Sequence, residues 1–164
     1  MNVRRLTSND VSVFVDLRYE GITKYPDGFL FTLEEIKRVD LRNVARMLDN
    51  GHIFGQFEDD RLIGFVGLNQ RRTQTTRHSA TLGPFYVTPD YHGSDAAQGL
   101  MDALIVTCKD EGILQIDLWV WSGNSRAIAF YERNGFERKG ELPRAVILNG
   151  QARDDYLLVR QLDC

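Results

Sequence analysis

Apolar residues recur at helical spacing in two stretches of the N-terminal third of the chain. In the first stretch, Ser8 or Asn9 is expected to cap a helix whose apolar face consists of Val11, Phe14, Val15 and Leu17. In the second, Thr32 and Glu35 have the spacing of a capping box, and Asn50-Gly51 is a typical helix end. The pattern therefore predicts two amphipathic helices, each with one buried face.

Alternating residues and turn dipeptides predict several short strands. Five of them are expected at residues 2–7, 52–57, 61–69, 136–147 and 151–161. Asp59-Asp60 joins one pair as a hairpin, and Asn149-Gly150, a strong hairpin dipeptide, joins the last pair. Together with the helices between them, these strands are predicted to form one mixed sheet.

Two further strands have distinctive interiors. Residues 79–88 contain Gly83-Pro84, and proline cannot donate to a strand ladder, so this strand is predicted to be bulged or locally unpaired there. Residues 114–121 alternate strictly, which predicts an apolar face of Leu114, Ile116, Leu118 and Val120.

The stretch from Val87 to Leu104 combines a strand end, a loop of small residues and a helix. It reads VTPDYHGSDAAQGLMDAL, and the helix has its apolar positions at Ala97, Leu100, Met101, Leu104, Ile105 and Cys108. Such a strand–loop–helix directs backbone N–H groups toward one point at the positive end of a helix. This arrangement suits a phosphate or pyrophosphate, although a tight turn that only needs Gly93 explains the pattern equally well.

A second stretch, Asn124 to Phe136, favours the phosphate site over the simple tight turn. Together with Val87 to Leu104, it resembles the acyl-CoA-binding motif and the following helix of the GNAT superfamily of N-acetyltransferases. The resemblance extends to RLIGFVGL and ELPRAVILNGQARDDYLL and covers nearly the whole chain. It implies an α/β (α+β) fold in a single domain over residues 1–164. The expected architecture is a mixed, mostly antiparallel central sheet flanked by about four helices, with a bulged strand before the cofactor-loop helix.

The resemblance also implies transfer of an acetyl group from acetyl-CoA to a primary amine of a small molecule or peptide by direct attack. Tyr131 matches the family's general acid, which protonates the leaving thiolate. The cofactor-binding positions carried over are Phe85, Tyr86, Val87, His92, Gly93, Ser94, Asp95, Ala96, Ala97, Gln98, Asn124 and Ala127. Candidate acceptor-binding residues are Arg18, Glu20, Tyr25, Trp121 and Glu141. The strand before the loop offers no acidic base, so Glu20 or Glu141 acting through water is the remaining candidate.

The pyrophosphate loop departs from the family pattern of Arg or Gln, two residues, Gly, one residue, then Gly or Ala. In that register His92 takes the first position and Asp95 the fourth, whereas Ala97 conforms at the sixth. At ~5 Å and an effective dielectric near 20, a carboxylate repels one phosphate charge by roughly 3 kcal/mol before screening. Asp95 could instead cap the helix. A second hypothesis is therefore a catalytically degenerate GNAT-fold binding or regulatory module with weakened CoA binding.

Composition and charge narrow the classes of partner that the chain is expected to bind. The 164 residues include 20 basic and 23 acidic ones, for a net charge of −3, and no basic run exceeds two residues, so neither nucleic acid nor an anionic membrane is an expected partner. The polar N-terminus does not resemble a signal peptide, and no apolar run has the length of a membrane span. Cys108 and Cys164 have no metal-site spacing. We expect a cytoplasmic protein without a metal, with acetyl-CoA and an unidentified amine as partners, and a homodimer is a further expectation.

Overall fold

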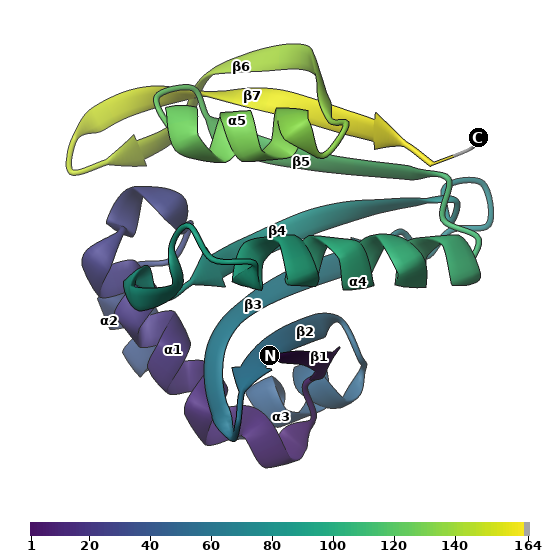
Figure 1. Ribbon diagram of the computed structural model, residues 1–164. Helices are drawn as coiled ribbons and strands as arrows, with labels where there is room; N and C mark the ends of the chain where they lie inside the picture. Colours follow the sequence, from purple (N-terminus) through teal and green to yellow (C-terminus); the bar gives the residue numbers. More distant parts are fainter. Residues whose placement is uncertain (163–164) are drawn as a thin grey trace. The chain divides into compact units, whose positions relative to one another are not determined.

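The computed structural model describes residues 1–162, which contain seven strands and five α-helices (Figure 1). In chain order these are β1 (Asn2–Arg5), α1 (Val11–Lys24), α2 (Leu33–Lys37), α3 (Leu41–Asp49), β2 (Ile53–Glu58), β3 (Arg61–Gln70), β4 (Ser79–Val87), α4 (Ala96–Asp110), β5 (Gln115–Trp121), α5 (Ser125–Arg133), β6 (Glu137–Leu148) and β7 (Gln151–Gln161).

The strands pair in the order β1-β2-β3-β4-β5-β7-β6. The pairs β1–β2, β2–β3, β5–β7 and β6–β7 are antiparallel, whereas β4 and β5 are parallel, with Ser79 opposite Gln115 and Thr81 opposite Asp117. The prediction of a mixed, mostly antiparallel sheet is therefore confirmed.

The chain groups into two compact units. The N-terminal unit comprises Met1–Asn69 and Gly83–Thr107, and the C-terminal unit comprises Gln70–Leu82 and the described residues from Cys108 onward. β4 contributes its first half to the C-terminal unit and its second half to the N-terminal unit. A single domain over residues 1–164 stays a prediction.

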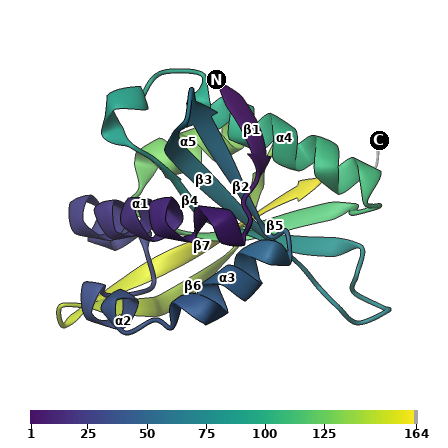
Figure 2. The same ribbon diagram turned by 90° about the horizontal axis from the view of Figure 1, so that it is seen from below.

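In the N-terminal unit, helices cover both faces of the strands. Phe14 of α1, Val44 of α3 and Phe65 of β3 are members of one buried apolar cluster, and the Phe14 and Phe65 rings meet edge to face with centroids 5.1 Å apart. On the opposite face α4 packs closely, since a Cβ at Gly64 of β3 would lie 3.3 Å from Leu100 of α4. Figure 2 shows α3 and α4 on opposite sides of β1–β3.

Two predicted helix boundaries are wrong. The chain after β1 is capped by Thr7, not by Ser8 or Asn9, because Thr7 forms a capping box with Asp10 and one 3₁₀ turn precedes α1. The helix predicted from Thr32 to Asn50 is divided into α2 and α3. Asp40 causes the break, since its carboxylate accepts from the Arg42 N–H at 2.9 Å and starts a new helix, which is the role that aspartate prefers over a helix interior.

In the C-terminal unit, α5 lies against the β5-β7-β6 strands (Figure 1). The β6–β7 hairpin turns at Asn149-Gly150, where both residues have positive φ, as a tight hairpin turn requires. A bulge in β6 places Arg144 at φ +53, and the Asp154 carboxylate accepts from the Arg144 N–H at 2.8 Å and so braces the bulge. Leu114 lies before β5 and is exposed, so its predicted place on the apolar face is wrong.

A buried ion pair joins the loop after β3 to β5. The Asp117 carboxylate is buried and accepts from Arg71 Nη2 at 2.7 Å and from Thr81 Oγ1 at 2.7 Å. The sequence predicted Asp117 on the polar face of its strand, but a buried carboxylate requires a partner.

Replacing Arg71 with alanine is expected to lower the free energy of unfolding by about 1–2 kcal/mol, because Asp117 would remain buried with one hydrogen bond fewer. The loss is smaller than for a fully buried pair since the Arg71 side chain is 47% exposed. Urea unfolding of Arg71→Ala and of the exposed neighbour Arg72→Ala measures the difference. Equal stability of the two variants would contradict the structural role of the pair.

Candidate functional site

The candidate residues divide between the two units. In the N-terminal unit they surround the end of β4 and the start of α4. The β4 backbone is irregular where the sequence predicted an interruption, because Gly83 has φ +142 and the Gly83–Pro84 peptide is cis. β4 pairs with β5 from Ser79 to Thr81, and these residues precede the irregular segment.

The predicted pyrophosphate loop forms a tight turn into α4. Gly93 adopts φ +81, which favours glycine, and Ser94 Oγ donates to Tyr91 O at 2.6 Å and accepts from Ala96 N at 3.2 Å. Asp95 is exposed, and its backbone carbonyl accepts from Gly99 N at 2.8 Å. Ser94 Oγ therefore caps the first amide of this helix, and a cap by the Asp95 carboxylate stays a prediction.

His92 holds the loop against the strand end. Its Nε2 lies 2.8 Å from the Val87 carbonyl oxygen, and its ring centroid lies 5.9 Å from that of Tyr25. At the position where the family has Arg or Gln, this chain thus has a side chain that is engaged with its own backbone.

Glu20 of α1 joins the helix to the end of β4. Its Oε1 accepts from Tyr86 Oη at 2.9 Å and from Thr88 Oγ1 at 2.6 Å, and Lys24 Nζ lies 3.4 Å away. Partial burial raises the pKa of Glu20, but the hydrogen bonds from Thr88 and Tyr86 and the nearby Lys24 outweigh it, so the net pKa is lowered. A carboxylate with a lowered pKa is a weak proton acceptor near neutral pH, and this argues against Glu20 as the base.

Aromatic rings pack around Tyr86, whose side chain is buried. Its ring centroid lies 6.2 Å from that of Tyr25 and 5.8 Å from that of Phe29. Gly21 permits this packing, since a Cβ there would lie 2.6 Å from the Phe29 ring. The N-terminal unit therefore brings Glu20, Tyr25, Tyr86 and His92 together. Arg18 is half-buried, with its guanidinium 5.0 Å from the centre of the Phe31 ring.

In the C-terminal unit, Asn124 caps α5 and lies three residues after the end of β5. Its Oδ1 accepts from Ala127 N at 3.2 Å, and its own N–H donates to Trp121 O at 2.9 Å. The predicted cap is confirmed, and the Ala127 amide is engaged by that cap. Trp121 packs over Gly123, where a Cβ would lie 2.5 Å from the indole ring.

Tyr131 lies on α5 and is buried. Its ring packs edge to face against Phe130 and Phe136, with centroids 5.7 Å and 5.6 Å away. Burial raises the pKa of Tyr131, because the phenolate would lose its hydration. The phenol therefore keeps its proton throughout the physiological pH range.

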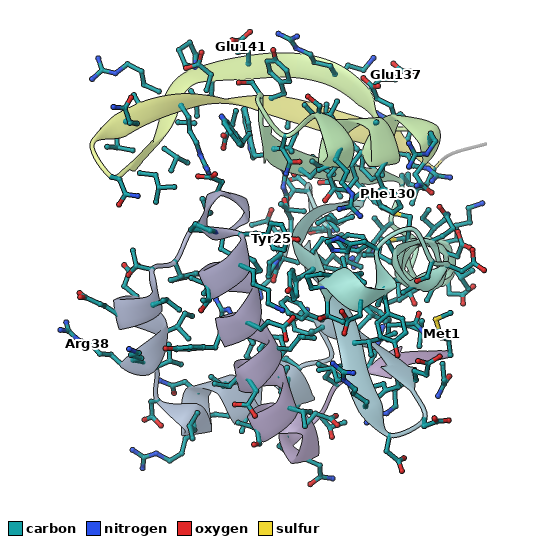
Figure 3. The ribbon with its side chains drawn as sticks, turned by 60° about the vertical axis from the view of Figure 1, so that its left-hand side comes forward. Met1, Tyr25, Arg38, Phe130, Glu137 and Glu141 are labelled. Atoms are coloured by element: carbon teal, nitrogen blue, oxygen red, sulfur yellow. The ribbon has the colours of Figure 1, made fainter. Side chains whose placement is uncertain are left out.

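Glu141, the other candidate for a water-mediated base, lies on β6. It is exposed and accepts from Arg138 Nη2 at 2.7 Å. Figure 3 shows Glu141 and Glu137 pointing outward from β6. The Glu141 carboxylate is thus paired with a neighbouring arginine, Arg138, on the same strand.

A further buried acid, Asp155, was not anticipated from the sequence. Asp155 of β7 is 8% exposed, lies opposite Trp121 of β5 and has its Oδ1 without a hydrogen-bond partner. Desolvation raises the pKa of Asp155, the nearby Arg153 opposes the rise, and Asp154 adds to it. A signal was present, since period-two alternation places Asp155 on the same face as the apolar Leu157 and Val159.

Within residues 1–162, no group of three or more His, Cys, Asp or Glu side chains is arranged to hold a metal ion. In the same part of the chain, no helix has both the length and the apolar character that crossing a membrane demands.

The chain is similar to known acetyltransferases in sequence. The sequence model of the Acetyltransferase (GNAT) family matches residues 19–136. An uncharacterised N-acetyltransferase of Mycobacterium tuberculosis is 34% identical over 104 residues, which span 63% of this chain and 63% of the relative.

Solved structures share the fold over nearly the full chain. An acetyltransferase of Salmonella typhimurium, solved with its cofactor acetyl-CoA, superposes with a TM-score of 0.85 at 17% identity and covers 100% of this chain and 95% of that one. The PaiA N-acetyltransferase of Thermoplasma acidophilum, in complex with coenzyme A, gives a TM-score of 0.74 at 22% identity over 98% of each chain.

Proposed function

Because the chain belongs to the GNAT family of acetyltransferases, we propose that it transfers an acetyl group from acetyl-CoA to a primary amine of a small molecule or peptide. The observation that carries the proposal is the buried phenol of Tyr131, seven residues after the Asn124 cap of α5. Buried tyrosines are common, but this one stands where the family has its general acid.

The start of α4 fits the pyrophosphate of acetyl-CoA. The first amides of a helix have no intrahelical acceptor, and the turn before α4 is formed by three exposed residues, Gly93, Ser94 and Asp95. A Cβ at Gly93 would meet no atom within 4 Å, so the turn itself is open. Asp95 is exposed, and its negative charge beside the phosphates is expected to weaken binding.

Acetyl-CoA supplies a thioester whose carbonyl carbon is attacked by the neutral amine. The backbone amides of Phe85, Tyr86 and Val87 are the proposed partners of the pantetheine arm and of the thioester oxygen, where an N–H donor stabilises the developing negative charge. Tyr131 donates its proton to the leaving thiolate. Arg18, Tyr25 and Trp121 stay candidates for acceptor binding.

The alternative is a GNAT-fold binding module without turnover, and the specific observation that favours it is the like charge of Asp95 beside the phosphate site. The test is an assay of thiol release with acetyl-CoA and a panel of primary amines, including amino acids, polyamines and peptides. Acetyl-CoA-dependent acetylation of at least one amine supports the transferase. Micromolar acetyl-CoA binding without turnover on any amine supports the module instead.

Asp95→Asn is expected to tighten acetyl-CoA binding by about tenfold at low salt, because it removes the repulsion between one carboxylate and two phosphate charges across water. The gain should shrink as salt rises, since exposed charges are screened. Calorimetric titration at low and high ionic strength measures both effects. Asp110→Asn, at the other end of α4, is the matched control and should leave the affinity unchanged. Equal affinities of Asp95→Asn and the wild type would place the phosphates elsewhere.

A further inference from the structure

The environment of Asp155 is typical of a functional residue. It is an almost fully buried carboxylate, and its Oδ1 has no hydrogen-bond donor among the described residues. Leaving a buried acceptor unsatisfied destabilises a fold, so such a group requires a reason to be there. Asp154, its neighbour, shows the structural use of an acid in this hairpin, since its carboxylate accepts from the Arg144 N–H.

The strand register places Asp155 at the C-terminal end of β5. It lies opposite Trp121, whose carbonyl accepts from the N–H of Asn124, the residue that caps α5. Ser122 N also donates to Asp154 O at 2.9 Å, which fixes this part of β7 beside the β5–α5 turn. Asp155 therefore lies beside the turn that leads into the helix of Tyr131.

We propose that Asp155 binds the ammonium group of the acceptor through Oδ1 and accepts the proton that makes the amine nucleophilic. This inference rests on the proposed acetyl transfer and supplies the base that the sequence did not reveal. An ammonium ion provides the missing donor, and a protonated primary amine is the ligand class that a buried, unpaired carboxylate selects.

The proton balance of the reaction is complete with this residue. The ammonium gives one proton to Asp155, the neutral nitrogen forms a bond to the thioester carbon, and the carbon–sulfur bond breaks. The thiolate takes a proton from Tyr131, and the second proton of the nitrogen returns to the phenol through solvent. Asp155 then releases its proton to solvent, which gives acetylated amine, free thiol and one proton.

Asp155 is better suited to this role than Glu20. Desolvation raises the pKa of Asp155, with Asp154 adding to the rise and Arg153 opposing it, whereas the net pKa of Glu20 is lowered. A base works best when its pKa approaches the working pH. The cross-strand neighbours of Asp155 are Trp121 and Leu142, neither of which carries a charge.

The test is Asp155→Asn in the full chain, with an amine that the wild type acetylates. We expect kcat/KM for the amine to fall at least 100-fold near neutral pH and the defect to narrow as pH rises, because solvent then deprotonates the amine. Acetyl-CoA affinity should be unchanged. The matched control Asp154→Asn should lower the Tm and keep the wild-type shape of the pH profile.

The melting temperature distinguishes a catalytic role of Asp155 from a structural one. The pKa of Asp155 is raised in the folded chain, so the folded chain disfavours the charged carboxylate. The free energy of unfolding therefore falls as the pH rises above the pKa of Asp155 in the unfolded chain and through its pKa in the folded chain. Asp155→Asn should therefore melt at or above the wild-type temperature at pH 8, by a margin that disappears toward pH 4. A lower Tm with a pH-independent loss of activity would make Asp155 structural and overturn the proposal, as would wild-type activity of the variant.

A failure of acetyl transfer itself gives a different result. If the wild type acetylates no amine, the proposed function fails, and NMR titration of the Asp155 carboxyl carbon with benzylamine tests the residue on its own. A change in its chemical shift and apparent pKa on adding the amine supports an ammonium site. An unchanged titration overturns it.

Discussion

Tyr131→Phe is expected to lower kcat by about 10²- to 10³-fold while leaving the fold and the affinity for acetyl-CoA intact. The substitution removes one oxygen from a ring that packs between Phe130 and Phe136, so the packing stays. In the proposed reaction, the variant loses the proton that Tyr131 gives to the leaving thiolate. Because the loss occurs only as the carbon–sulfur bond breaks, kcat and kcat/KM should fall together.

The control for this prediction varies the leaving thiol of the acyl donor. An acyl donor with a more acidic thiol needs less protonation, so the difference between Tyr131→Phe and the wild type should narrow with it. Steady-state kinetics with acetyl-CoA and with such a donor measure the ratio. An unchanged kcat in Tyr131→Phe would show that solvent protonates the thiolate and would leave Tyr131 a packing residue.

The local elements of the fold could be predicted because short stretches of sequence determine them. The capping box of Thr32 and Glu35, the cap at Asn124 and the turn at Asn149-Gly150 each depend on residues within a few positions. The break at Asp40 was missed for a physical reason. The apolar period continues through it, and periodicity does not register a cap inside the run.

The site was less predictable because its electrostatics depend on residues far apart in sequence. Glu20 is bound by Tyr86 and Thr88, more than sixty positions away, and this contact lowers its pKa. Asp155 is buried by strand pairing with β5 and β6. Neither environment can be derived from neighbours in the chain, whereas the cap formed by Asn124 could be predicted locally, and the role of Tyr131 stays a prediction.

Gly67→Ala is expected to lower the free energy of unfolding by about 3 kcal/mol, at the upper end of the usual range for overpacking. A Cβ at Gly67 of β3 would lie 2.3 Å from the carbonyl oxygen of Gly83 and 3.2 Å from Ile53. A side chain can rotate away from such a contact, but the Gly83 carbonyl belongs to the backbone. The two strands must therefore separate at this point.

The same displacement should weaken acetyl-CoA binding, since Gly83 immediately precedes the β4 residues proposed to bind the pantetheine arm. We expect the Tm to fall by about 6–12 °C and the Kd to rise by about tenfold in the folded variant. Gly28→Ala is the control, because a Cβ there meets nothing within 4 Å. It should leave both quantities nearly unchanged. A destabilised Gly67→Ala that binds acetyl-CoA as tightly as the wild type would separate the position of β4 from cofactor binding.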